Sequence, residues 1–273
     1  PDNLILRAAQ AVLDHGRVSA EVRFGLEKCI PMGAGLGGGS SNAAAVLLAL
    51  PVLAGLRIPL ETLGRIGAGL GSDVPFFLYG GTALGIGRGT ELYPLADVPP
   101  HAGILVAPGV HVSTAEAYRD LGRRPVTELS PSGDPALTLA EAGADTDGFR
   151  SLVWRLAAAR PSEGWARLCT NDFEPAVFAR HPELLAIKRR LAKVGASPAM
   201  MTGSGSALFG LFQTSAEADS GFAALTRRSS AETPTTRITL MTRSRYRSEW
   251  RRFLAGQIDP DIQWPPQSSY SKP

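Results

Sequence analysis

The sequence predicts an α+β protein with two domains. A glycine-rich loop at residues 33–42 joins an alternating, strand-like segment to a run of strong helix formers. A Pro-containing linker at 97–100 precedes a short apolar strand at 103–107. Beyond this strand, strand and helix patterns alternate, which is typical of an α+β domain. We therefore expect domains at 1–98 and 99–242 and a basic, then disordered, tail at 243–273.

The elements of the first domain follow from local patterns. Asn3 can cap a helix whose apolar residues recur at helical spacing as far as Gly16. Residues 18–26 alternate apolar and polar side chains and predict a strand. The helix after the glycine loop is bent or ended by Pro51. The remaining expectations are a helix at 60–70, a turn at 71–73 and a hairpin at 80–93.

The second domain begins with the apolar strand at 103–107. Residues 121–148 are rich in Pro, Ser, Gly and Asp, and we expect mostly surface loop there. The periodicity beyond them predicts helices at 149–159, 182–194 and 216–227 and strands at 206–212 and 237–241.

Composition excludes several classes of protein. The 273 residues are 44% hydrophobic with 30 Gly and 21 Pro, a globular balance with many turns. A formal charge of +3 gives no reason to expect a nucleic-acid partner. The longest stretch of small and apolar residues without charge, residues 43–56, is interrupted by Pro51 and is shorter than the roughly 18 residues that cross a bilayer. Cys29 and Cys169 stand alone, so we expect neither a disulfide framework nor a zinc site, and a cytoplasmic location.

The glycine-rich loop is the most informative segment for function. Glycines permit positive φ and let backbone amides approach a ligand closely. Because a helix follows the loop, unpaired N–H groups and the positive end of the helix dipole converge on one point, which favours an anion such as phosphate. We therefore expect the loop to bind a nucleotide.

Three readings of the loop compete. A Walker A loop requires Gly-Lys-Ser/Thr at its end, and Gly39 is followed by Ser40, so that reading fails. The pattern GxGxxG occurs at Gly33, Gly35 and Gly38, but a dinucleotide-binding unit also needs a second strand, and the next segment is another helix. A glycine-rich turn without a ligand is the third reading.

Residues 31–44, PMGAGLGGGSSNAA, resemble the phosphate-binding motif of the GHMP kinase superfamily. Within it, the form GGGSSNAA is similar to that of the kinases of 4-diphosphocytidyl-2-C-methyl-D-erythritol. Residues 71–78 and 201–206 resemble two further motifs of these kinases, and 108–118 and 171–174 are also similar. The resemblance implies an N-terminal S5-domain-2-like α/β part, a C-terminal ferredoxin-like α+β part and an active site in the cleft between them.

The resemblance also implies a reaction. The γ-phosphate of ATP would be transferred, with Mg²⁺, to the 2-hydroxyl of 4-diphosphocytidyl-2-C-methyl-D-erythritol in the non-mevalonate (MEP) pathway of isoprenoid synthesis. Asp73 matches the catalytic aspartate, and a carboxylate beside the hydroxyl can orient it and accept its proton. The alternative for Asp73 is an ordinary turn or helix-end residue. The implied partners are small molecules, and the chain would be a monomer or homodimer.

The implied binding residues fall into two sets. ATP phosphates would be held by Gly33, Gly35, Leu36, Gly37, Gly38, Gly39, Ser40, Ser41 and Lys28. The CDP-linked substrate would be held by Thr114, Tyr118, Gly203, Ser204 and Gly205. Plainer alternatives are a solvated lysine for Lys28, a packing role for Tyr118 and a simple turn for the second loop. The sequence identifies no magnesium ligand.

The sequence departs from the family at both ends. Family members begin with a Pro-Ala-Lys-x-Asn strand and a Tyr-His pair that reads cytidine, and neither precedes the helix at residue 4. Because that lysine would keep Asp73 ionised, we expect the chain as printed to be impaired, as a fragment of a true kinase or the result of a truncated gene model. The alternatives are an ATP-binding pseudokinase, or a kinase of homoserine, mevalonate or a sugar. The arginines at 243–252 indicate a solvated or terminal-helix feature rather than an anion site.

Overall fold

The computed structural model describes residues 3–121, 169–227 and 233–257. Two compact units divide the chain: unit 1 comprises residues 1–30, 37–100 and 240–273, and unit 2 comprises residues 31–36 and 101–239. The chain therefore passes from one unit to the other inside the glycine loop. The domain limits expected at 98 and 242 stay a prediction. The loop expected at 121–148, apart from its first residue, and the helix expected at 149–159 lie outside the described residues.

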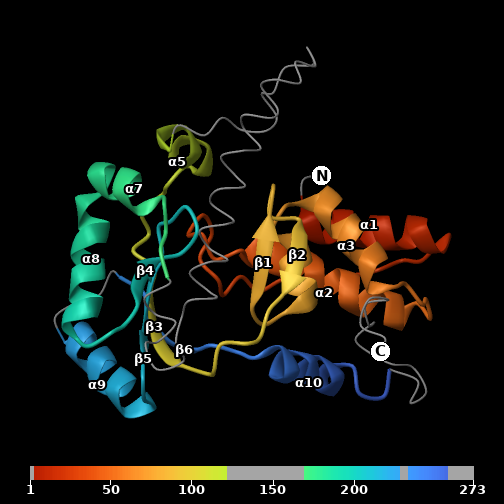
Figure 1. Ribbon diagram of the computed structural model, residues 1–273. Helices are drawn as coiled ribbons and strands as arrows, with labels where there is room; N and C mark the ends of the chain where they lie inside the picture. Colours follow the sequence, from red (N-terminus) through yellow and green to blue (C-terminus); the bar gives the residue numbers. More distant parts are fainter. Residues whose placement is uncertain (1–2, 122–168, 228–232, 258–273) are drawn as a thin grey trace. The chain divides into compact units, whose positions relative to one another are not determined.

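Unit 1 consists mainly of helices with one two-stranded hairpin (Figure 1). Its helices are α1 (Leu4–Gly16), α2 (Gly38–Leu53), α3 (Leu60–Leu70), α4 (Val74–Tyr79) and α10 (Arg243–Phe253). Its strands are β1 (Ala83–Ile86) and β2 (Glu91–Pro94), which pair antiparallel. The helices expected at 4–16 and 60–70 and the hairpin expected at 80–93 are confirmed.

Local chemistry accounts for the ends of these helices. The side chain of Asn3 accepts a hydrogen bond from the backbone N–H of Ile5 at 3.0 Å, so it caps α1 as predicted. Helix α2 begins at Gly38, inside the glycine loop and five residues before Ala43. Pro51 lies in its last turn, where only one backbone hydrogen bond is lost, and the helix continues to Leu53.

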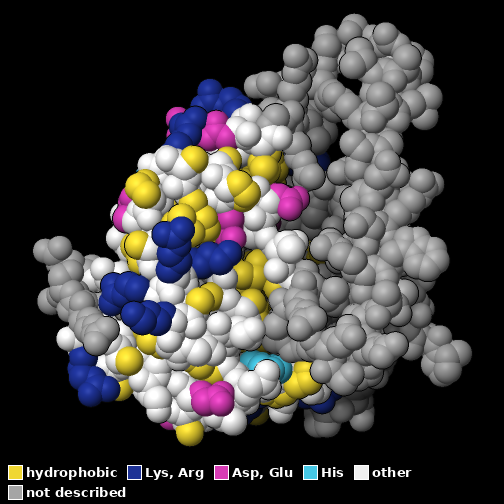
Figure 2. All heavy atoms as spheres, turned by 60° about the vertical axis from the view of Figure 1, so that its left-hand side comes forward, with side chains coloured by type: hydrophobic (Ala, Val, Ile, Leu, Met, Phe, Trp, Pro, Cys, Tyr) yellow, Lys and Arg dark blue, Asp and Glu magenta, His cyan; other side chains and the backbone are white. Residues whose placement is uncertain are grey.

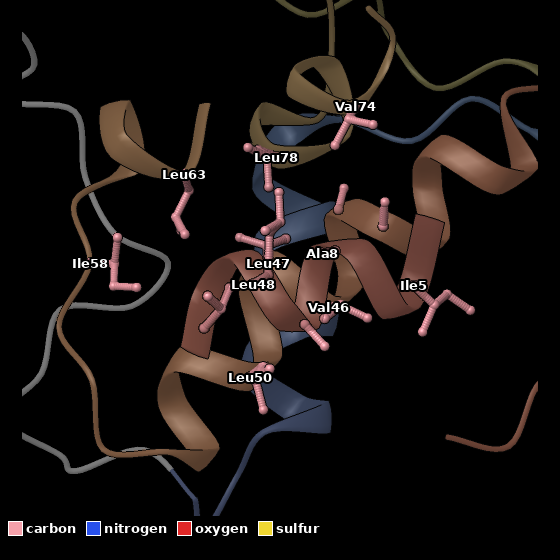
Figure 3. Close-up of a cluster of buried hydrophobic side chains, with 14 of the residues drawn as sticks. Ile5, Ala8, Val46, Leu47, Leu48, Leu50, Ile58, Leu63, Val74 and Leu78 are labelled. Carbon is pink, nitrogen blue, oxygen red and sulfur yellow. The ribbon is translucent and has the colours of Figure 1, made fainter. Parts of the chain in front are cut away.

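The core of unit 1 is built around α2 (Figure 3). Figure 3 shows side chains of α1, α2, α3 and α4 converging on one cluster, with Leu47 and Leu48 near its centre. Because α2 is apolar on every side, it can be enclosed by its neighbours rather than present a polar face to water. Leu254, just after α10, is also buried in this cluster, and the partly buried Trp250 of α10 packs against it, so α10 is anchored to the core although none of its own residues is buried.

The strand expected at 18–26 is wrong. Residues 18–29 have no regular secondary structure, and Phe24 and Leu26 are exposed. Alternation of apolar and polar side chains indicates an extended chain, but a strand also needs a neighbour that completes its hydrogen-bond ladder. Among the described residues no strand pairs with this segment, and Val22 packs against the unit 1 core instead.

Unit 2 contains a four-stranded antiparallel sheet in the order β4-β5-β3-β6. Its strands are β3 (Ala102–Val106), β4 (Ala199–Met201), β5 (Leu208–Phe212) and β6 (Thr235–Thr239). The strands predicted at 103–107 and 206–212 are confirmed. The last strand begins two residues earlier than expected at 237–241 and ends at Thr239.

Helices cover one face of this sheet, as Figure 1 shows. They are α8 (Pro182–Lys193) and α9 (Ser215–Thr226). Helix α7 (Glu174–Arg180) lies beside α8, and α5 (Thr114–Asp120) lies beside α7. Buried Leu184 and Leu191 of α8 pack with Phe212 of β5 in the core. The helices expected at 182–194 and 216–227 and the α+β class are thereby confirmed. No helix of the described residues is long and apolar enough to cross a membrane.

Candidate active site

The second half of the glycine loop forms the N-terminus of α2 in unit 1. Gly37 occupies the cap position with φ 66°, in the left-handed region, and no side chain caps the helix. The Ser41 N–H donates to the carbonyl of Gly37 at 2.8 Å, and its hydroxyl donates to the carbonyl of Gly38 at 2.9 Å. The first N–H groups of α2 therefore have no side-chain acceptor, and this end of the helix suits an anion.

Helix α4 positions the predicted base and contacts the same loop. Asp73 is the residue immediately before α4, its side chain is exposed, and it makes no capping hydrogen bond to the helix. One turn further along α4, the ring of Phe77 lies so close to Gly37 that a Cβ on this glycine would come within 2.8 Å of it. Phe77 thus links α4, the helix that follows Asp73, to the start of α2.

The first half of the loop belongs to unit 2, where it contacts the loop of residues 202–206. The buried Ala34 carbonyl accepts hydrogen bonds from the Ala207 N–H and the Thr202 hydroxyl, each at 3.1 Å. At Gly35, with φ 70°, a Cβ would lie 2.5 Å from the Thr202 carbonyl oxygen and 2.9 Å from that of Gly205. Only glycine permits this approach, which brings two predicted binding segments into contact.

Two predicted substrate residues are hydrogen-bonded to each other. The hydroxyl groups of Thr114, the first residue of α5, and Ser204 lie 3.0 Å apart. Tyr118 of α5 is 42% exposed, and its ring meets the ring of Phe173 edge to face at 5.0 Å. Tyr118 therefore packs against one aromatic neighbour and still presents surface to a ligand.

No pattern in the sequence predicts that Arg243 is an internal residue. Its side chain is 18% exposed, and its guanidinium donates to three backbone carbonyls, those of Gly80, Leu95 and Thr82, at 3.1, 3.2 and 2.6 Å. Its backbone N–H donates to Asp97, which also accepts from the Thr82 N–H. This member of the arginine-rich segment therefore holds the start of α10 against the hairpin of unit 1.

Tyr246 connects α10 to α4. Its hydroxyl donates to the Phe77 carbonyl, and its ring lies where a Cβ on Gly80 would come within 2.4 Å. Burial raises the pKa of this phenol, with a smaller opposing effect from Trp250, so the hydroxyl stays neutral and able to donate. The sequence predicts only a solvated or terminal-helix feature at 243–252. In the structure this segment forms α10, which supports α4, the helix that follows Asp73.

Lys28 and the metal site are less defined. Lys28 is exposed in the segment without regular structure before the loop. The described part of the chain contains no group of three or more His, Cys, Asp or Glu side chains that could hold a metal ion. A Mg²⁺ ion bound mainly through substrate phosphates needs only one or two carboxylates from the protein. The absence of a larger cluster among the described residues is therefore compatible with such an ion.

A basic hollow lies elsewhere on unit 2. Figure 2 shows Lys and Arg side chains on the face that this view brings forward. A cavity of about 510 Å³ at the C-terminal ends of α8 and α9 is lined by Arg190, Lys193 and Arg227 among others, and by none of the predicted site residues. Arg190 donates to the Leu225 carbonyl and Arg227 to the Ala223 carbonyl, so these two cations stabilise the end of α9.

Family comparisons agree with the geometry of the two loops. Residues 3–81 match the GHMP kinases N terminal domain, and residues 156–231 match the GHMP kinases C terminal domain. A homoserine kinase from Cytophaga hutchinsonii, 19% identical, shares the fold with a TM-score of 0.62 over 88% of this chain and 76% of its own. The fold and the loops therefore define a kinase of the GHMP class.

More similar relatives narrow the class. The 4-diphosphocytidyl-2-C-methyl-D-erythritol kinase of Solibacter usitatus is 53% identical over 99% of this chain and 79% of its own length. A crystal structure of 4-(cytidine 5'-diphospho)-2C-methyl-D-erythritol kinase is 36% identical, with a TM-score of 0.63 over 87% of this chain and 77% of that one. The chain belongs to the 4-diphosphocytidyl-2-C-methyl-D-erythritol kinase family of the GHMP kinases. The resemblance predicted from the motifs is confirmed.

Proposed function

We propose that this protein transfers the γ-phosphate of ATP to the 2-hydroxyl of 4-diphosphocytidyl-2-C-methyl-D-erythritol. The observation that carries the proposal is the glycine loop, which leads into an uncapped helix N-terminus and contacts α4, the helix that follows Asp73. The 53% identity to a kinase of that name, over nearly the whole chain, supports the choice of substrate.

The loop would bind the triphosphate of ATP. Gly33, Gly35 and Gly37 all have positive φ, the conformation found in anion-binding backbone nests, and the dipole of α2 adds positive potential at its first turn. Because the loop contains no lysine, its amides and a Mg²⁺ ion on the phosphates would share the neutralisation of the triphosphate. Ser40, in the first turn of α2, would add a hydroxyl contact.

Asp73 would act as the general base. Its carboxylate is exposed and is not used to cap α4, so it can reach a hydroxyl group of a ligand. Oriented there, it would accept the proton as the hydroxyl oxygen attacks the γ-phosphorus, while ADP leaves on the opposite side. Thr114, Ser204 and Tyr118 would hold the CDP-linked substrate.

A transfer assay tests the proposal. The chain is incubated with 4-diphosphocytidyl-2-C-methyl-D-erythritol, Mg²⁺ and ATP labelled at the γ-phosphate, and labelled product is measured in a single turnover. We expect product, formed more slowly than by a kinase that carries the Pro-Ala-Lys-x-Asn strand, and a further loss of at least about 100-fold in Asp73→Asn, the usual contribution of a general base. Homoserine and mevalonate serve as alternative acceptors.

Asp14→Asn is the matched control, because Asp14 is an exposed carboxylate of α1 that only accepts a hydrogen bond from Gln10. This variant should keep the wild-type rate. Equal rates in Asp73→Asn and Asp14→Asn would reject Asp73 as the base. Binding of an ATP analogue with no transfer to the CDP-linked substrate would reject the proposed reaction in favour of a non-catalytic binding protein.

A further inference from the structure

The segment Asn171-Asp172-Phe173-Glu174 resembles the family but has no role in the reaction as proposed. In unit 2 it lies beside the loop of residues 202–206, far away in sequence. The side-chain amide of Asn171 donates two hydrogen bonds, to the Met201 carbonyl at 2.9 Å and to the Gly203 carbonyl at 2.8 Å. One side chain therefore holds both the last residue of β4, Met201, and Gly203 of the loop.

Glu174 contacts the same residue, Met201, at the end of β4. Glu174 is 9% exposed, and its carboxylate accepts the Met201 N–H at 2.9 Å and pairs with the ammonium group of Lys188. Met201 is thus fixed through its N–H by Glu174 and through its carbonyl by Asn171. A buried carboxylate with these two partners is satisfied, so the segment forms a rigid support.

Asn171 also contacts the other predicted substrate element. Its side-chain carbonyl accepts the Phe173 N–H at 2.9 Å, which fixes the turn that places the Phe173 ring against Tyr118. On the loop itself, Ser204 is hydrogen-bonded to Thr114, four residues before Tyr118. The loop and the aromatic side chain therefore share one anchor, and three of the four hydrogen bonds available to an asparagine amide are used.

We propose that Asn171 is a positioning residue that sets the 202–206 loop in register with Tyr118 for binding of the CDP-linked acceptor. The inference rests on the proposed function for its kinetic consequence, but the contacts that it explains are independent of turnover. Asn171 acts through the loop and through Phe173.

The substitution Asn171→Asp separates the two halves of this role. A carboxylate still accepts the Phe173 N–H, so the turn before α7 is kept. It cannot donate to the Met201 and Gly203 carbonyls, and it places a negative charge beside their oxygens, so the loop is released. Asn171→Ala removes both contacts without adding charge. The matched control is Gln213→Glu, the same change of amide to carboxylate at an exposed position of unit 2.

Hydrogen exchange measures the loop without any ligand. The amides of Thr202, Gly205 and Ala207 are hydrogen-bonded within the loop or to Ala34. Asn171→Asp should raise exchange about tenfold or more in a peptide that covers residues 199–207, and leave peptides of β3 and α9 within about twofold of wild type, since opening of this loop is local. Asn171→Ala should show the same pattern, and Gln213→Glu should show none.

Kinetics give the second readout. In Asn171→Asp the value of kcat/KM for the acceptor should fall at least about tenfold, while KM for ATP changes less than about twofold, because a tenfold change corresponds to the net free energy of one or two such hydrogen bonds. Unchanged exchange at 199–207 in both variants would overturn the proposal, as would faster exchange throughout unit 2, which indicates a general loss of stability. If wild-type protein transfers no phosphate, the proposed function fails, and the exchange pattern still decides whether Asn171 holds the loop.

Discussion

Replacing Gly35 by alanine should disrupt the contact between the two loops of unit 2. The new Cβ would lie 2.5 Å from the Thr202 carbonyl oxygen and 2.9 Å from that of Gly205, both backbone atoms. It would also hold an L-residue at φ 70°, in the left-handed region. Gly109, in the same unit and also with φ 70°, has no atom within 4 Å of the corresponding Cβ position, so Gly109→Ala is the control for stability.

The expected magnitudes follow from these two terms. The left-handed conformation costs an alanine about 1–2 kcal/mol at either position. At Gly35 the two carbonyls must also move away, which breaks the hydrogen bonds that the Ala34 carbonyl accepts from Ala207 and Thr202. At about 1 kcal/mol each, these add roughly 2 kcal/mol. Gly35→Ala should therefore lower the free energy of unfolding by about 3–4 kcal/mol and Gly109→Ala by about 1–2 kcal/mol.

Urea unfolding of the two variants, followed by circular dichroism, measures the difference. Gly35→Ala should also weaken binding of an ATP analogue, since the amide that it carries is displaced, whereas the stability of Gly109→Ala reports only the backbone conformation. If the two variants lose the same stability within about 0.5 kcal/mol, the close approach of the two loops contributes nothing, and the argument from the missing Cβ is wrong.

Two further predictions concern α10. Arg243→Lys should lower the free energy of unfolding by about 2–4 kcal/mol, because an ammonium group cannot donate to all three carbonyls in the geometry of the guanidinium. The control, Arg245→Lys at an exposed position, should stay within about 0.5 kcal/mol of wild type. Equal losses of stability in the two variants would refute the role given to the guanidinium. Tyr246→Phe should cost about 1 kcal/mol in thermal or urea unfolding. Because burial raises the phenol pKa above its ordinary 10.0, this contribution is complete below pH 10 and is lost as pH rises through the raised value, so the two proteins should converge only in alkali; a difference that vanishes near neutrality would contradict this assignment.

Much of the fold could be predicted because its elements carry local signals. Helices with a cap and a regular apolar face, such as α1, and short apolar strands such as β5 stand where the sequence places them. The strand predicted at 18–26 is absent, because alternation of apolar and polar side chains says nothing about whether a neighbouring strand is there to pair with. The start of α2 was missed because glycine is a poor helix former, and residues 38–41, expected in the loop, instead form the first turn of the helix.

The site could be predicted only where residue type and spacing carry the chemistry. The spacing of the motifs predicts that the glycine loop and Asp73 belong to the site. Thr114 and Ser204, both predicted to bind the substrate, are hydrogen-bonded to each other. Thr202 and Ala34 are 168 residues apart, and no local pattern predicts their hydrogen bond. Arg243 shows the same limit, because an arginine within a basic stretch looks solvent-exposed until the fold supplies three carbonyls.

The position of Arg243 also affects how unit 1 can form during synthesis on the ribosome. Arg243 lies 163 residues after Gly80, whose carbonyl accepts a hydrogen bond from its guanidinium. At about 5–20 residues per second, translation needs about 8–30 s to cover that distance. During this interval the carbonyls of the hairpin and of Phe77, near the C-terminal end of α4, are hydrogen-bonded to water instead of to α10. A nascent chain would therefore expose an incomplete unit 1, which chaperones and proteases can bind.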